Sequence, residues 1–200
     1  LGLVAAGVIA KKILARLGIS IEADLLAIGG DSDKSHFEQM ILTSIKNQDS
    51  LGGLVECRVK GVPVGWGEPF FDSVESEISH LVFSIPATRG IEFGEGFAAA
   101  TRKGSQHNDP IIDASGKTLT NNAGGINGGI TNGNDIVFRV AVKPTSSISS
   151  KQQSFNTETG KVEELVVRGR HDACIALRVP VIVEAAAAIA LADLKARANR

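Results

Sequence analysis

The spacing of apolar residues near the start of the chain changes from helical to extended. In residues 6–17 apolar side chains recur every three or four positions, which predicts an amphipathic helix with a core-facing stripe. The stripe consists of Ala6, Ile9, Ala10, Ile13, Leu14 and Leu17. Gly18 ends this pattern, and apolar residues then alternate with polar ones over residues 19–25, as in a strand with one buried face.

Three further segments have helical patterns. Ser35 with Glu38, and Asp72 with Glu75, have the spacing of capping boxes, and each pair precedes an apolar stripe. They predict helices over residues 35–47 and 72–85, the second ended by a proline. An alanine-rich helix is predicted from Pro180 to about Ala196, with proline in its first turn.

The remaining apolar segments alternate with a period of two. Strands are predicted at 55–59, 91–93 and 136–142, and a turn between two extended arms at 156–160. A parallel sheet covered on both sides would have strands that are apolar on both faces, whereas these strands have one polar face. The pattern therefore predicts an α+β fold in which antiparallel sheets are layered with helices.

Composition narrows the class of protein. The 200 residues are 43% apolar and carry a net charge of −1, which fits one globular domain and gives no general attraction to nucleic acid or anionic membranes. Cys57 and Cys174 lack metal-ligand spacing and suit reduced thiols in a cytoplasmic protein, so no metal site is predicted. The longest apolar stretch, residues 179–192, is too short and too polar to cross a membrane.

A glycine- and asparagine-rich segment precedes a cluster of cationic and hydroxyl groups. Residues 121–134 contain five glycines and five asparagines, and Lys143-Pro-Thr-Ser-Ser147 follows the next strand. Such a backbone can present amides to an anion, and a lysine with hydroxyls would complete the site. The alternative is a long hairpin loop followed by a polar strand end. The residues alone leave both readings open.

Two common nucleotide motifs are excluded. Gly116-Lys-Thr118 resembles the end of a P-loop, but Ile111 stands where the first glycine belongs. The glycines at 124–129 miss the dinucleotide-binding spacing and open no helix.

Titratable residues are concentrated at 168–172. Arg168, Arg170, His171 and Asp172 lie within five residues, so a guanidinium could bind an anion beside a carboxylate that transfers a proton. The alternative is that Asp172 caps a following helical segment while the arginines are solvated.

Several motifs, in one order, resemble the C-terminal part of chorismate synthases. The strongest are Gly169-Arg-His-Asp-Ala-Cys174 with Val179-Pro-Val-Ile-Val-Glu184, Asn122-Ala-Gly-Gly-Ile-Asn-Gly-Gly129, and Lys143-Pro-Thr-Ser-Ser147. Further matches are Gly52-Gly-Leu-Val-Glu-Cys57, Gly65-Trp-Gly-Glu-Pro69, Ser84-Ile-Pro-Ala87 and Gly90-Ile-Glu-Phe-Gly94. The resemblance covers essentially the whole chain.

The resemblance implies that residues 1–200 are the C-terminal portion of a single β-α sandwich domain that assembles as a homotetramer. It implies an enzyme that uses reduced FMN to eliminate phosphate from 5-enolpyruvylshikimate 3-phosphate, giving chorismate. The flavin contacts carried over are Pro86, Ala87, Gly128, Lys143, Pro144, Thr145, Ser146, Ser147 and Arg170. Asp172 stands where the family has an acidic residue implicated in proton transfer.

The chain departs from the family pattern in two ways. Ala173 replaces the usual proline after Arg-His-Asp, a small change. The family's N-terminal Ser-His-Gly motif, basic segment and Arg-Ser-rich motif, which supply catalytic histidines and substrate-binding groups, are not found here. We therefore expect a truncated chain with an exposed core face, and the alternative function is a flavin-binding or assembly fragment without catalysis.

Overall fold

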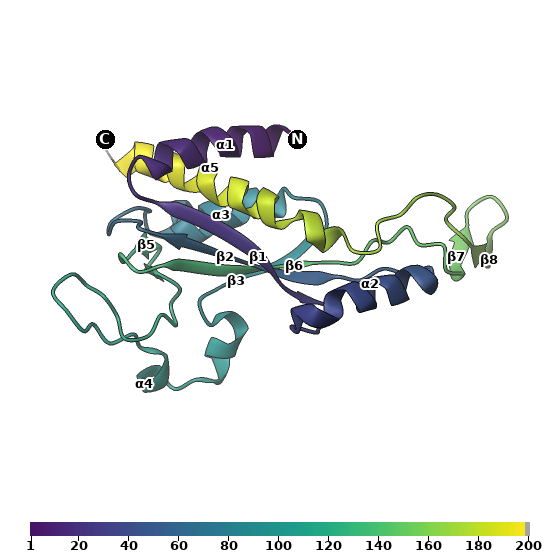
Figure 1. Cartoon of the computed structure of the whole chain (residues 1–200), viewed down its shortest axis with the longest axis horizontal. Helices are drawn as coiled ribbons and strands as arrows, with labels where there is room; N and C mark the ends of the chain where they lie inside the picture. Colours follow the sequence, from purple (N-terminus) through teal and green to yellow (C-terminus); the bar gives the residue numbers. More distant parts are fainter. Residues whose placement is uncertain (199–200) are drawn as a thin grey trace.

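The computed structural model describes residues 1–198, in which one antiparallel sheet carries a layer of helices (Figure 1). The helices are α1 (Gly2–Ala15), α2 (Phe37–Lys46), α3 (Val74–Phe83), α4 (Gly104–His107) and α5 (Pro180–Ala198). The strands are β1 (Ser20–Ile28), β2 (Gly53–Lys60), β3 (Thr88–Phe93), β4 (Ile126–Asn127), β5 (Ile130–Thr131), β6 (Ile136–Val142), β7 (Gln152–Asn156) and β8 (Lys161–Leu165). Short 3₁₀ turns cover Lys34–His36, Phe70–Asp72, Gly96–Thr101 and Ile175–Arg178.

The main sheet has the order β1-β2-β6-β3, and every neighbouring pair is antiparallel. Alternate residues form its apolar face: Cys57 lies between Ala23 and Phe138, and the rings of Phe138 and Phe93 are 5.5 Å apart. The predicted α+β fold with antiparallel strands is confirmed.

The other face of the sheet is charged, as the one-sided patterns require. Arg139 lies at its centre and pairs with Glu56 on β2 at 3.0 Å and with Glu92 on β3 at 3.4 Å. Asp24 continues this row on β1, opposite Glu56. Arg139 thus links β2 and β3 through ion pairs, whereas Asp24 is paired with Lys34 from the 3₁₀ turn outside the sheet.

Helices α5 and α3 lie over the apolar face, and α1 packs along α5 (Figure 1). The alanines of α5 let it approach its neighbours closely; Ala186 and Ala187 are fully buried. Gly7 of α1 lies against Ala185, where a side chain on Gly7 would collide with the alanine. Small residues on both helices therefore set the close contact.

The predicted core-facing stripe of α1 is only partly correct. Ala10 and Leu14 are buried, whereas Ile9 and Ile13 are 64% and 44% exposed, and Leu17 just beyond the helix is also exposed. The helix turns Gly7 towards α5, so Ile9 and Ile13 point outward while Leu14 stays in the core. This leaves an apolar face of α1 uncovered in the described residues.

Both predicted capping residues are wrong by one or two positions. The Asp33 carboxylate accepts a hydrogen bond from the Ser35 amide and starts a 3₁₀ turn ahead of α2. Ser73, rather than Asp72, caps α3, since its hydroxyl accepts from the Ser76 amide at 3.1 Å. The Asp72 carboxylate pairs instead with Arg197 at 3.2 Å.

The predicted turn at 156–160 joins β7 and β8, which form a two-stranded hairpin projecting from one end of the molecule (Figure 1). Phe155 and Val162, paired across this hairpin, are 60% and 65% exposed. Within residues 1–198 no helix combines the length and apolar character needed to cross a bilayer.

Candidate active site

Two segments that the resemblance assigns to flavin binding, Pro86-Ala87 and residues 143–147, meet at the Val142 end of β6. Thr88 of β3 pairs with Val142, and the Lys143 amide donates to the Ala87 carbonyl at 2.9 Å. Ala87 has a φ of +71°, a conformation that costs free energy for a residue other than glycine. The strained turn at Pro86-Ala87 thus lies beside Lys143, where the resemblance puts the flavin.

The loop after Lys143 also contacts the Arg-His-Asp run. The Thr145 hydroxyl donates to the Asp172 carbonyl oxygen at 2.9 Å. The hydroxyls of Ser146 and Ser147 form no hydrogen bond within residues 1–198. Two hydroxyls are therefore available to an anionic or polar ligand next to Asp172.

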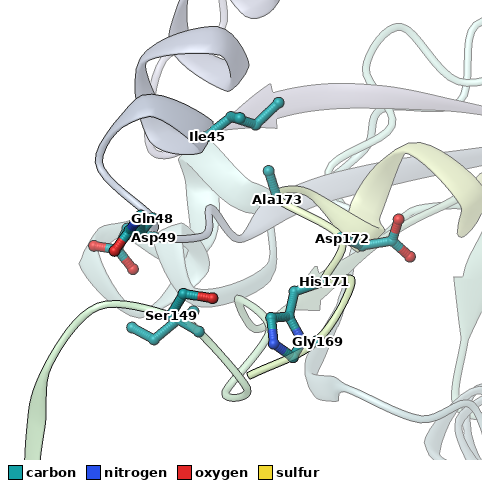
Figure 2. Close-up of a pocket in the computed structure, with 9 residues that line it drawn as sticks. Ile45, Gln48, Asp49, Ser149, Gly169, His171, Asp172 and Ala173 are labelled. Atoms are coloured by element: carbon teal, nitrogen blue, oxygen red, sulfur yellow. The ribbon is translucent and has the colours of Figure 1, made fainter. Parts of the chain in front are cut away.

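A cavity of about 190 Å³ lies between this region and the end of α2. Its lining consists of Ile45, Gln48, Asp49, Ile148, Ser149, Gly169, His171, Asp172 and Ala173. The His171 ring Nε2 lies 3.1 Å from the Val167 carbonyl oxygen. Figure 2 shows the Asp172 carboxylate pointing away from Gln48 and Asp49, so Asp172 borders the cavity but directs its charge elsewhere.

The Asp172 carboxylate pairs with Arg178, with 2.9 Å between Oδ2 and Nη1. The side chains are 40% and 75% exposed, so the pair is open to solvent. The alternative of a helix cap is wrong: Cys174 occupies the N-cap position of the following 3₁₀ turn, and no side chain bonds to that end. Asp172 lies two residues too early and is held by Arg178 instead.

Arg170 is exposed, and its guanidinium forms neither a hydrogen bond nor an ion pair with the described residues. Its five donors are free to bind a planar or anionic group.

Among the flavin contacts implied by the resemblance, Gly128 does not lie at the Val142 end of β6. It lies in the tight turn between β4 and β5, and the Gly129 carbonyl accepts from the amide of Val74, at the start of α3. This turn lies beyond the Ile136 end of β6, and the strand from Ile136 to Val142 is itself about 20 Å long at 3.3 Å per residue. A single anion site formed by residues 121–134 with Lys143 is therefore wrong, because a seven-residue strand separates the two parts.

The glycine- and asparagine-rich segment has a structural role of its own. Gly124 and Gly94 approach so closely that a side chain on either would meet the other's backbone. Asp109, from the preceding loop, accepts hydrogen bonds from the amides of Asn122 and Ala123 at 2.7 and 2.9 Å, and from the Thr120 hydroxyl. Burial raises the pKa of Asp109, but these bonds and nearby His107 outweigh it, and the net pKa lies below the ordinary value.

We expect Asp109→Asn to loosen this segment in the complete protein. Asn cannot replace all three acceptor interactions, so the loss is about 1–2 kcal/mol, or about 5- to 30-fold faster amide exchange at residues 120–125. Because the folded pKa is lowered, the wild-type anchor is present above the unfolded pKa and is lost as pH falls through the folded pKa. Hydrogen exchange followed by mass spectrometry, at neutral and acidic pH, measures both effects.

The control is Asp113→Asn, since that carboxylate accepts bonds only within its own turn, from Ser115 and Lys117. Unchanged exchange at 120–125 in Asp109→Asn would show that the anchor contributes nothing.

Neither of the two thiols lines the cavity beside Asp172. Both are buried, and burial raises the pKa of Cys57 and of Cys174. A raised pKa keeps a thiol protonated and weakly nucleophilic.

The residue pattern did not indicate Ser50 and Arg178 as site residues. Ser50 contacts the Lys143–Ser147 loop, and Arg178 holds the Asp172 carboxylate. The only local signal for Ser50 was its place just before the Gly52-Gly53 break, and a solvated arginine gives none.

Comparisons with known proteins agree on one family. A sequence profile described as chorismate synthase matches residues 1–195. The chorismate synthase of Chitinophaga pinensis is 63% identical over 100% of this chain and 60% of its own length. That of Korarchaeum cryptofilum is 41% identical over 98% of this chain and 61% of its own length.

A solved structure titled "Crystal Structure of Chorismate Synthase" matches with a TM-score of 0.78 and 30% identity, covering 96% of this chain and 61% of the solved one. The chain thus spans about three fifths of the length of these relatives. The family profile and the full-length match to the Chitinophaga pinensis enzyme show that this chain belongs to the chorismate synthase family.

Proposed function

We propose that the protein carrying this chain converts 5-enolpyruvylshikimate 3-phosphate to chorismate and phosphate with reduced FMN, and that residues 1–200 are the C-terminal portion of its single domain. The observation that carries the proposal is 63% identity to a chorismate synthase over the whole chain. The meeting of the Ala87, Lys143–Ser147 and Asp172 segments at one end of β6 supports it.

The residues at this end suit a flavin. The hydroxyls of Ser146 and Ser147 and the guanidinium of Arg170 are unpaired donors within the described chain. Ala87 is held in a strained turn beside Lys143. Phosphate and flavin oxygens are acceptors that such donors recognise. In the proposal Pro86, Ala87, residues 143–147 and Arg170 hold the cofactor.

Asp172 is the proposed catalytic residue. Reduced FMN, when bound, supplies electron density as phosphate leaves and recovers it as a proton is lost. The Asp172 carboxylate receives a proton near the flavin, and its contact with Arg178 holds the side chain in place at this end of β6. The Thr145 hydroxyl fixes the backbone that carries it.

We also propose a cytoplasmic homotetramer. The uncovered apolar residues Ile9 and Ile13 on α1, and the exposed Phe155 on the projecting hairpin, are the surfaces that further chain or further copies would cover. Because Gly128 lies at the opposite end of β6 from Lys143, we assign its contact to a flavin held by a neighbouring copy.

FMN titration of the complete protein in the presence of substrate tests the proposed site. Flavin fluorescence should be quenched, and Arg170→Ala should weaken binding by about 1.5–3 kcal/mol because a charge-assisted donor is lost. Arg168→Ala is the matched control, since Arg168 is also exposed but lies outside the proposed contacts. An unchanged spectrum at saturating FMN, together with no chorismate in an anaerobic assay, would refute the proposal.

A further inference from the structure

The short connection from α2 to β2 contacts both loops of the candidate site. The Ser50 hydroxyl donates to the Thr145 carbonyl oxygen at 2.6 Å. The Leu51 amide donates to the Ala173 carbonyl oxygen at 2.7 Å. Adjacent residues of one connection therefore hold the loop after Lys143 and the Arg-His-Asp run.

These contacts form a continuous chain of hydrogen bonds. Ser50 holds the Thr145 carbonyl, and the Thr145 hydroxyl holds the carbonyl of Asp172. Residues 144–146 and 171–172 have no regular secondary structure, so no sheet or helix hydrogen bonds fix them. Ser50 and Thr145 are both half-buried, which limits competition from water for these bonds.

The backbone around Ser50 is shaped for this position. A side chain on Gly52 would lie 2.8 Å from the Val142 carbonyl oxygen and 3.1 Å from Pro144, so glycine permits the close approach of the strand end. On the other side Gln48 has a φ of +57°, and its carbonyl accepts from the Ser150 amide at 3.0 Å. A strained turn and a glycine thus hold Ser50 against the loop.

We infer that Ser50 is a positioning residue, whose hydroxyl fixes the Lys143–Ser147 loop and, through Thr145, the backbone of Asp172. The inference rests on the proposed function of these two segments. Ser50 itself contacts neither the Asp172 carboxylate nor the free hydroxyls of Ser146 and Ser147; it acts through Thr145.

Ser50→Ala in the complete protein tests the inference. Loss of one net hydrogen bond should lower turnover and raise the half-saturating FMN concentration, each by roughly three- to tenfold, with little change in melting temperature. In the flavin-free protein, amide exchange in residues 143–147 and 170–173 should become faster by a similar factor. Ser50→Thr, which keeps the hydroxyl, should restore both.

The matched control is Ser150→Ala. Its hydroxyl lies 3.4 Å from the Asn47 carbonyl oxygen and does not reach the two loops, so turnover and exchange should stay at wild-type values. Wild-type exchange in Ser50→Ala would overturn the inference. Equal losses of turnover in Ser50→Ala and Ser50→Thr would also overturn it, because Ser50→Thr keeps the hydroxyl. A large fall in melting temperature would do the same, because it would indicate that the substitution destabilises the whole fold. If the wild-type protein neither binds FMN nor makes chorismate, the proposed function fails, while the exchange experiment still tests the role of Ser50.

Discussion

Asp172→Asn in the complete protein should lower chorismate formation by about 10²- to 10⁴-fold, the usual loss when a general base is removed. Asn keeps the size and hydrogen-bonding reach of the side chain but cannot accept the proton. Stability should hardly change, because the ion pair with Arg178 is exposed to solvent and such pairs contribute about 0–1 kcal/mol. FMN affinity and the melting temperature should therefore stay close to wild type.

Arg178→Gln separates proton transfer from the ion pair. It breaks the same 2.9 Å contact but leaves the Asp172 carboxylate in place. If Asp172 transfers a proton, Arg178→Gln should retain most of the turnover that Asp172→Asn loses. Equal losses of turnover in the two variants would mean that turnover depends on the ion pair and not on Asp172 acting as a base. Near-normal turnover in Asp172→Asn would show that Asp172 transfers no proton in the reaction.

The main sheet was predictable because its two faces differ so strongly in chemistry. Val55, Cys57 and Val59 point into the core, while Glu56 and Arg58 between them belong to the charged face. A period of two with such contrast fixes which side of a strand is buried. The same contrast excluded a parallel sheet, and the antiparallel pairing confirms this.

The orientation of α1 was not predictable from its apolar stripe. A stripe shows which residues can be buried, but the close contact with α5 is made where residues are smallest, at Gly7 and Ala10. Ile9 and Ile13 then face outward. Which face of α1 packs against the sheet and α5 depends on the shape of α5. The residues of α1 alone do not determine that shape.

The candidate site shows the same limit at longer range. Gly128 and Lys143 are close in sequence, which suggested one anion site, but β6 lies between them and carries them to opposite ends. Conversely, Ser50 and Thr145 are 95 residues apart and are joined by a 2.6 Å hydrogen bond. Pairing between strands decides both outcomes, and no local pattern reports it.

The 200-residue chain alone should form no chorismate above the uncatalysed rate, even with reduced FMN under anaerobic conditions. Of its histidines, His171 borders the candidate site, and its ring nitrogen lies against the Val167 carbonyl oxygen. His36 is held by Asp31 at 2.9 Å, beside α2. We therefore expect that these histidines do not replace the family's N-terminal groups, to which the resemblance assigns catalysis and substrate binding.

Inactivity must be separated from failure to fold, because the apolar face of α1 is uncovered. Circular dichroism of the purified chain should show the helical signal expected from α1, α3 and α5. Adding the separately produced N-terminal part of the Chitinophaga pinensis enzyme, a relative 63% identical to this chain, should then restore measurable turnover. If the isolated chain turned over substrate by itself, the groups that bind phosphate and move protons would have to lie within residues 1–200. Asp172 and Arg170 would then be the first pair to replace, since they offer a carboxylate and an unpaired guanidinium at the same end of β6.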